Sequence, residues 1–231
     1  LAAAADVPEP LESLIQPDHG AEGVQRVCGY GLIDEDYLLH SGDRRVTLVA
    51  QASIRIDSFL VFEVPVPIEF RRAEGDKRVI VSLAYDPPVR RRRAEYLGVE
   101  LYFSLIRGKT RDEVIEAYRA VTTEERDAAK RRLEKLQGAF QAPFRCQLKP
   151  GPTALATSTL QRAEWTFKRE GNDYGDPWYL VVRADRNWAP DSISEQDFAL
   201  TVTLEAAEEQ LYNLVRNRVR ARQQQRARAR S

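Results

Sequence analysis

The sequence has little of what most catalytic or disulfide-bonded proteins need: its 231 residues include two cysteines, two histidines and no methionine. Cys28 and Cys146 are too few for a disulfide framework, which predicts a reducing compartment, the cytoplasm, although a single bridge between them remains an alternative. No apolar run approaches the ~20 residues that cross a bilayer, so no membrane association is predicted. His19 and His40 have no cysteine or carboxylate at a ligand spacing, so neither is predicted to bind metal.

The chain opens with Leu1-Ala2-Ala3-Ala4-Ala5, which are good helix formers without a preceding N-cap. This opening and the missing methionine predict that the alanines end a helix that begins elsewhere, and that the chain is a fragment. Residues 1–43 are otherwise short and irregular, with a predicted turn at Pro17-Asp18-His19-Gly20.

Charge is distributed unevenly along the chain. Basic and acidic residues balance at 35 each, but seven arginines and no acid follow Gln210, so the rest carries 28 basic and 35 acidic groups, a net charge of −7. The seven are the predicted partner-binding residues: Arg216, Arg218, Arg220, Arg222, Arg226, Arg228 and Arg230. Alternatively, Arg216, Arg218 and Arg220 pair with the chain's own acids, or Val219–Arg222 form an edge strand blunted by charge. A protein or self surface is favoured over nucleic acid.

Residues 44–204 show the pattern of an antiparallel β domain. Short runs rich in β-branched and aromatic residues alternate with Gly, Pro and charged turns, and in Val99–Leu105 the apolar residues occupy every second position. Eight strands are predicted, near Arg45–Gln51, Phe59–Val66, Arg78–Tyr85, Leu97–Ile106, Phe144–Leu148, Thr157–Lys168, Trp178–Ala184 and Phe198–Leu204. This number predicts a mainly β fold, a sandwich or jelly roll.

Helices are predicted in two places. Thr110-Arg-Asp-Glu113 and Thr122-Thr-Glu-Glu125 both fit a capping box, which predicts a helical hairpin inserted at residues 110–140. Residues 205–231 are predicted to form a C-terminal helix whose arginine-rich end frays.

Two other groups of side chains are candidates for binding. Asp173 and Asp176 lie in a predicted turn rich in Asn, Asp and Gly. Their oxygen atoms make calcium binding an alternative to the prediction that the chain has no cofactor. The backbone preferences of Asn, Asp and Gly for turns are enough to explain these residues without a metal. Trp165, Trp178 and Trp188 would suit a carbohydrate-binding face, whereas the alternation of Trp165 with Phe167 favours a core position.

Several stretches together resemble bacterial intracellular subtilisin-like serine peptidases, in the region that follows the catalytic motifs. They are Leu1-Ala-Ala-Ala-Ala-Asp-Val-Pro8 with Cys28-Gly-Tyr-Gly31 and Tyr37-Leu-Leu39, Val79–Pro88 with Arg93 and Tyr96-Leu97, Ser158–Gln161 with Trp165, Tyr179–Val182, Trp188 and Phe198–Glu205, and Leu211–Arg220. The resemblance implies that residues 1–43 are the end of a subtilase catalytic domain, that 44–204 are its β-sandwich accessory domain, and that the parent protein is a serine endopeptidase.

The resemblance does not extend to catalytic residues. The Asp-Thr/Ser-Gly, His-Gly-Thr and Gly-Thr-Ser-x-Ala signatures are missing from the sequence. The dipeptide His19-Gly20 is followed by Ala21 and therefore does not match His-Gly-Thr. No catalytic residue is predicted, and the chain alone is expected to be inactive. The implied role is to stabilise the catalytic domain or to recruit a substrate or a partner, for which the family suggests an AAA-type ATPase. The alternative is an autonomous binding module for carbohydrate or a polyanionic partner.

Overall fold

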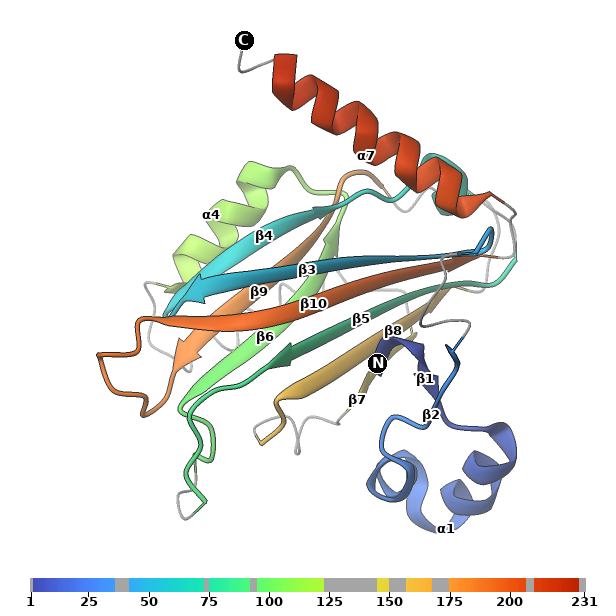
Figure 1. Ribbon diagram of the computed structural model, residues 1–231, viewed down its shortest axis with the longest axis vertical. Helices are drawn as coiled ribbons and strands as arrows, with labels where there is room; N and C mark the ends of the chain where they lie inside the picture. Colours follow the sequence, from blue (N-terminus) through green and yellow to red (C-terminus); the bar gives the residue numbers. More distant parts are fainter. Residues whose placement is uncertain are drawn as a thin grey trace.

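The computed structural model describes residues 2–35, 42–72, 75–91, 95–122, 145–149, 157–167, 175–206 and 210–228. Its fold is mainly β, as the sequence predicts, and all eight predicted strands are present (Figure 1). They are β3 (Arg45–Arg55), β4 (Ser58–Val64), β5 (Lys77–Tyr85), β6 (Val99–Arg107), β7 (Arg145–Lys149), β8 (Leu160–Phe167), β9 (Trp178–Arg186) and β10 (Glu195–Ala206).

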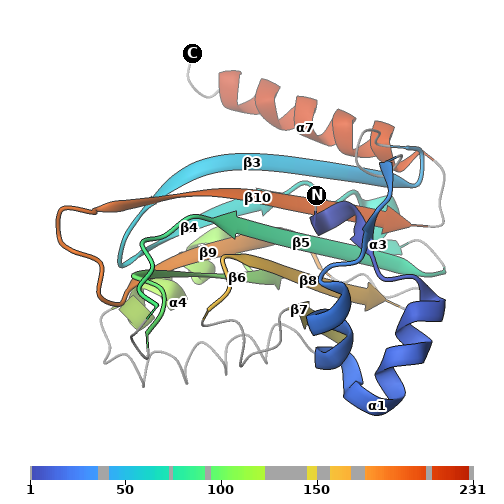
Figure 2. The ribbon, with the colours of Figure 1, turned by 60° about the horizontal axis from the view of Figure 1, so that its bottom comes forward.

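The strands form two antiparallel sheets with the connections of a jelly roll. One sheet has the order β3-β10-β5-β8-β7 and the other the order β4-β9-β6. The chain changes sheet at nearly every step, because β3, β5 and β10 lie in the first sheet while β4, β6 and β9 lie in the second. Figures 1 and 2 show the five-stranded sheet in front of the three-stranded one.

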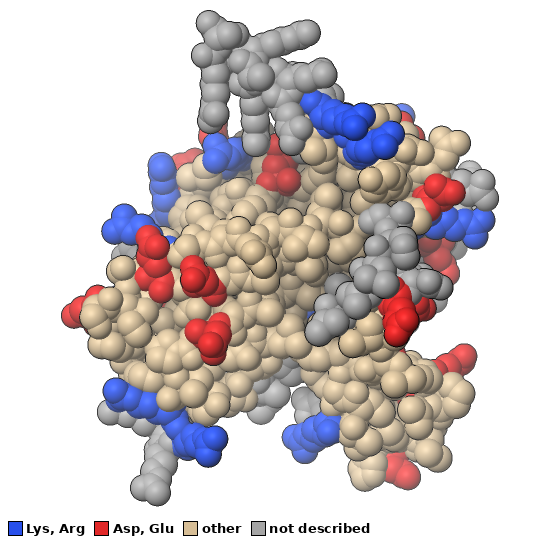
Figure 3. Space-filling model, in the orientation of Figure 1, with Lys and Arg blue, Asp and Glu red and all other residues tan. Residues whose placement is uncertain are grey.

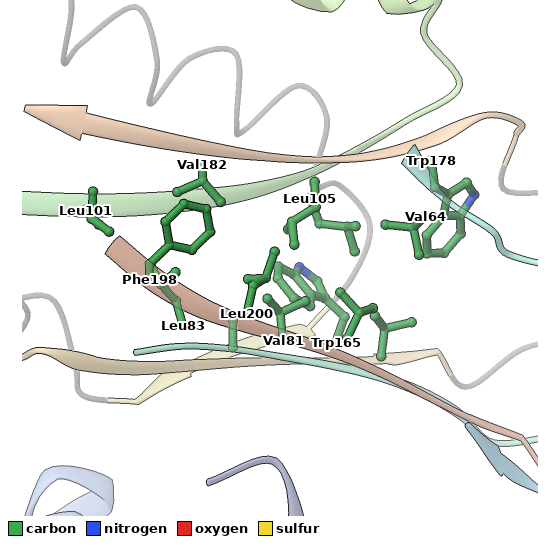
Figure 4. Close-up of a cluster of buried hydrophobic side chains, with 14 of the residues drawn as sticks. Val64, Val81, Leu83, Leu101, Leu105, Trp165, Trp178, Val182, Phe198 and Leu200 are labelled. Carbon is green, nitrogen blue, oxygen red and sulfur yellow. The ribbon is translucent and has the colours of Figure 1, made fainter. Parts of the chain in front are cut away.

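The core lies between the two sheets. Alternate residues of each strand face inward, so Val81 and Leu83 of β5 share one core with Leu180 and Val182 of β9, and all four are 0% exposed. Figure 4 shows Val81, Leu83 and Val182 among the side chains between the sheets. Trp165, at 3% exposure, also lies in this core. A second, smaller cluster forms on the outer face of the three-stranded sheet.

This smaller cluster explains why β9 is apolar at consecutive positions. Its outward-facing Tyr179 and Val181 are covered by Val114 and Tyr118 of α4 (Arg111–Thr122). The predicted capping box opens α4: Thr110 Oγ1 accepts a hydrogen bond from the Glu113 backbone amide, and the Glu113 carboxylate accepts one from the Thr110 amide. The second helix of the predicted hairpin lies outside the described residues.

The first 35 residues differ from the prediction of an irregular segment. Ala2–Ala4 form a short 3-10 turn, η1, and the chain then enters β1 (Ala5–Asp6), which pairs with β2 (Leu32–Ile33). Ala2–Ala4 therefore form one turn of 3-10 structure that leads into a strand. Between the strands lies α1 (Glu9–Cys28), so the predicted turn at 17–20 is instead a kink within helical structure, at Gly20 with φ 63°.

The C-terminal helix, α7 (Leu211–Arg228), begins later than predicted. Glu205 and Ala206 are the last residues of β10 and do not start the helix. The alternative edge strand at 219–222 is wrong, because these residues belong to the helix, which extends to Arg228. Alanine, arginine and glutamine are strong helix formers, which explains this extent. A short helix, α3 (Ile68–Arg72), follows β4. None of the helices in the described ranges is both long and apolar enough to span a bilayer.

Candidate functional site

Residues 2–35, which we call the N-terminal unit, are held against the outer face of the five-stranded sheet by two long-range hydrogen bonds. Arg162 Nη1 donates to the Ala5 carbonyl at 2.6 Å, and the Tyr30 hydroxyl donates to the Leu160 carbonyl at 2.5 Å. Both partners on the sheet side belong to β8. The N-terminal unit is therefore bound to the jelly roll through β1 and through the turn before β2.

Gly31 makes the close pairing of β1 and β2 possible. It adopts φ 96°, in the left-handed region that L side chains rarely occupy, and a Cβ atom there would overlap the backbone carbonyl of Asp6. The second glycine of the Cys28-Gly29-Tyr30-Gly31 motif is thus a packing requirement of the N-terminal unit.

Alternating charges join the strands beneath the N-terminal unit. Arg45 Nε lies 3.2 Å from Glu205, Arg78 Nη2 lies 2.7 Å from Glu205, and Arg78 Nη1 lies 3.4 Å from Glu164. Arg162 Nη2 completes the row at 3.1 Å from Glu164. Burial alone would lower the pKa of Arg78, but the carboxylates of Glu205 and Glu164 outweigh it and raise that pKa. The row fixes the register of four strands where the N-terminal unit contacts them.

A cavity of about 430 Å³ remains between the N-terminal unit and this row of charges. Its charged lining consists of Asp6, Asp34, Arg45, Arg78, Arg162 and Glu205. Three arginines thus face three carboxylates, so the lining is neutral and favours neither an anion nor a cation. We interpret the cavity as part of the internal interface.

The N-terminal unit also carries exposed apolar side chains, two of which, Leu32 and Ile33, line the cavity. Leu14 is 72% exposed, Val27 69% and Leu32 68%, and Leu11 and Ile33 are also exposed. Among the described residues, nine large hydrophobic side chains are exposed, and these are five of them. We call these five residues the apolar face. Large apolar side chains gathered in 35 residues are typical of an interaction surface, whereas single exposed ones are ordinary.

The arginines after Gln210 divide into an anchored group and an exposed group. Arg218 Nη2 donates to both carboxylate oxygens of Asp176 at 2.8 Å, and Arg71 Nη2 lies 3.4 Å from the same carboxylate. Arg216 lies over the ring of Tyr212, and Arg220 is exposed. Arg222, Arg226 and Arg228 lie in the last turns of α7, and Arg230 lies outside the described residues. The alternative of pairing within the chain thus holds for Arg218.

Asp176, one of the two calcium candidates, is the carboxylate that Arg218 and Arg71 share. Asp173 lies outside the described residues. Within the described ranges, no three His, Cys, Asp or Glu side chains gather as metal ligands would. We therefore assign Asp176 a structural role in anchoring α7.

The core position predicted for Trp165 is confirmed. Trp165 and Trp178 are 3% and 1% exposed in the core, so neither offers a ring to a sugar. Trp188 is half-buried beneath the Arg90 guanidinium, 4.1 Å from the ring centroid. Cys28 is half-buried and forms no disulfide, and His19 is exposed on α1.

Tyr30 gives the attachment of the N-terminal unit a pH dependence. Burial raises the pKa of Tyr30 to about 12 from its ordinary value of 10.0, against smaller lowering effects of Ser158 and Arg162. A raised folded-state pKa means that the stabilisation is complete below pH 10 and is lost as the pH rises through 12. We expect protection of β1 and β2 from hydrogen exchange to fall over this range.

The matched variant for this prediction is Tyr30→Phe, which removes only the hydroxyl. It is expected to weaken the attachment by about 1 kcal/mol at neutral pH and to abolish its alkaline dependence. Because the pKa of Tyr85 is also raised to about 12 by burial, the measurement must be local to β1 and β2, not global. Equal alkaline loss of protection in the wild type and Tyr30→Phe would contradict the assignment.

Comparison with known proteins gives one extended similarity. No protein-family profile matches the chain. A protein of Sinorhizobium fredii named "Uncharacterized protein y4bN" is 40% identical over 221 residues, which cover 94% of this chain and 48% of that protein. The chain thus spans about half the length of this relative.

Proposed function

We propose that this chain is the non-catalytic accessory region of a subtilisin-like serine endopeptidase, and that its N-terminal unit attaches the jelly roll to the catalytic domain. The observation that carries the proposal is that the N-terminal unit is attached to the sheet and still keeps large apolar side chains exposed. Arg162 and Tyr30 bind it to the sheet, whereas Leu14 and Val27 of α1 are exposed to solvent. A segment built this way is suited to joining two bodies.

Two further observations support the proposal. The motifs that resemble the subtilisin-like peptidases include the alanine run and the Cys28–Gly31 turn, which lie in the N-terminal unit itself. The relative from Sinorhizobium fredii is about twice as long as the part of it that this chain matches. A catalytic domain in such a remainder would supply an apolar partner surface.

In this function the jelly roll is a rigid support. It stabilises the catalytic domain or brings a substrate or a partner protein, such as an AAA-type ATPase, close to the active site, and it works in the cytoplasm without a cofactor. No residue of the chain takes part in the chemistry.

The test uses the full-length gene product that contains this chain. A fluorophosphonate probe, which labels activated serines, and hydrolysis of an unfolded protein substrate measure peptidase activity. We expect labelling of the full-length protein, and a loss of activity of about tenfold or more in the double variant Leu14→Asp, Val27→Asp, since two charges would be buried unpaired in the interface.

The control is Val49→Asp, because Val49 is equally exposed, at 69%, but lies on β3 in the jelly roll. It is expected to leave activity unchanged. A full-length protein that neither reacts with the probe nor hydrolyses substrate would overturn the peptidase assignment. Equal activity of the double variant and Val49→Asp would overturn the role of the apolar face.

A further inference from the structure

The second half of α7 has no apolar side by which to pack. Leu211 and Val215 are buried at 2% exposure, Val219 packs against the same core, and the spacing of four residues makes them one stripe. Val219 is followed by Arg-Ala-Arg-Gln-Gln-Gln-Arg-Ala-Arg, in which alanine is the only apolar residue. The helix nevertheless continues for nine residues, about 13 Å, beyond that point.

This extension carries only positive charge. We call Arg220–Arg228 the basic extension; it contains Arg220, Arg222, Arg226 and Arg228 and no acid. The start of the basic extension is fixed relative to the jelly roll, because Arg218, two residues before it, donates to both carboxylate oxygens of Asp176 at 2.8 Å. In Figure 1 this half of α7 leads away from the sheets.

The complementary charge lies in the N-terminal unit. Residues 1–35 contain seven acids (Asp6, Glu9, Glu12, Asp18, Glu22, Asp34 and Glu35) against Arg26, a net charge of −6. Glu9, Glu12 and Asp18 are exposed on α1. Residues 36–209 carry the remaining 27 basic and 28 acidic groups, a net of −1. Nearly all the charge imbalance of the chain is therefore in its two terminal segments.

The two charged segments lie at opposite ends of the molecule. In both ribbon views α1 lies at the bottom and α7 at the top, with the jelly roll between them (Figures 1 and 2). Figure 3 shows that much of the intervening face has no charged side chain. Surface charges separated by more than a screening length of about 10 Å interact little, so the two segments of one chain cannot neutralise each other.

We propose that the chain associates head to tail, with the basic extension of one copy bound to the acidic α1 of a second copy. Guanidinium groups pair with carboxylates in two-pronged contacts, and in the sequence only alanine and glutamine separate Arg220, Arg222 and Arg226. Such an interface joins two different surfaces, so it produces chains or rings and not an isolated two-fold dimer. The proposal does not depend on the peptidase assignment.

The experiment is sedimentation velocity of the 231-residue chain at salt concentrations of about 0.1 M and 1 M, where the screening lengths are about 10 Å and 3 Å. Self-association at the lower salt and monomers at the higher salt are expected. The variant Arg220→Gln, Arg222→Gln, Arg226→Gln, Arg228→Gln keeps good helix formers and is expected to weaken association at least tenfold.

Two further variants make the test specific. Arg55→Gln, Arg91→Gln, Arg111→Gln, Arg119→Gln removes the same charge from exposed positions elsewhere and is expected to associate like the wild type. Glu9→Gln, Glu12→Gln, Asp18→Asn is expected to reproduce the loss caused by the α7 variant.

Three outcomes would overturn the proposal. The first is a monomer at low salt, and the second is association that survives in the α1 variant but not in the α7 variant. The third is tight binding of a labelled oligonucleotide that only the α7 variant abolishes, without self-association, since this would assign the basic extension to nucleic acid.

Discussion

Leu180→Ala is expected to lower the free energy of unfolding by about 2–5 kcal/mol, the range for removing a buried leucine side chain. Leu180 is 0% exposed and lies on β9, the middle strand of the three-stranded sheet, facing the core. Because its neighbours come from both sheets, the gap can close only if strands move. Domains are stable by about 5–15 kcal/mol, so one substitution removes a large share.

The matched control is Leu14→Ala, which deletes the same atoms from a side chain that is 72% exposed. In the 231-residue chain this change is expected to alter stability by less than about 0.5 kcal/mol. Denaturant titration followed by circular dichroism measures both. A loss for Leu14→Ala as large as that for Leu180→Ala would mean that the apolar face is buried in the isolated chain.

The jelly roll could be predicted from the sequence because its signal is local. Val99, Leu101 and Leu105 of β6 face the core, as do Ala163 and Trp165 of β8, so a period of two residues identifies these strands. The order of the strands carries no comparable signal. Pairing of β3 with β10 joins residues about 150 positions apart, such as Val46 with Leu204, and only the folded topology reveals it.

The N-terminal unit could not be predicted in the same way. Pro17 and Gly20 correctly mark a break, but they cannot tell a turn between irregular segments from a kink between two helical ones. The attachment of the unit depends on Arg162 and Ala5, which are 157 residues apart. Arg162 occupies a strand position that faces outward, so the sequence pattern suggests solvent, yet it is only 2% exposed.

The candidate site could likewise be predicted from the sequence only in part. Seven arginines after Gln210 stand out in the sequence as a single basic group, whereas the structure divides them by contact: Arg218 is bound to Asp176 and Arg220 is exposed. The acidic character of residues 1–35 could have been counted from the sequence. Its significance required the fold, because only the structure places α1 and α7 at opposite ends of the molecule.

Arg162→Ala is expected to destabilise the chain by about 3 kcal/mol and to free the N-terminal unit from the sheet. Removing one partner of a buried ion pair costs about 3–5 kcal/mol, because the other charge stays buried. We expect a loss of stability at the lower end of this range for two reasons. Glu164 keeps a second cation, Arg78, at 3.4 Å, and Arg162 Nε has no hydrogen-bond partner among the described residues. The Ala5 carbonyl also loses its 2.6 Å donor.

Arg183→Ala is the matched control, because Arg183 Nε likewise binds a carboxylate two residues further along its strand, Asp185 at 2.6 Å, but on the three-stranded sheet. Both variants are expected to lose stability, whereas only Arg162→Ala should expose β1 and β2 to hydrogen exchange while β5 and β10 stay protected. Equal protection of β1 and β2 in the two variants would show that the buried guanidinium of Arg162 does not hold the N-terminal unit. Selective release would instead identify it as the main link between the jelly roll and the segment that, in the proposed function, contacts the catalytic domain.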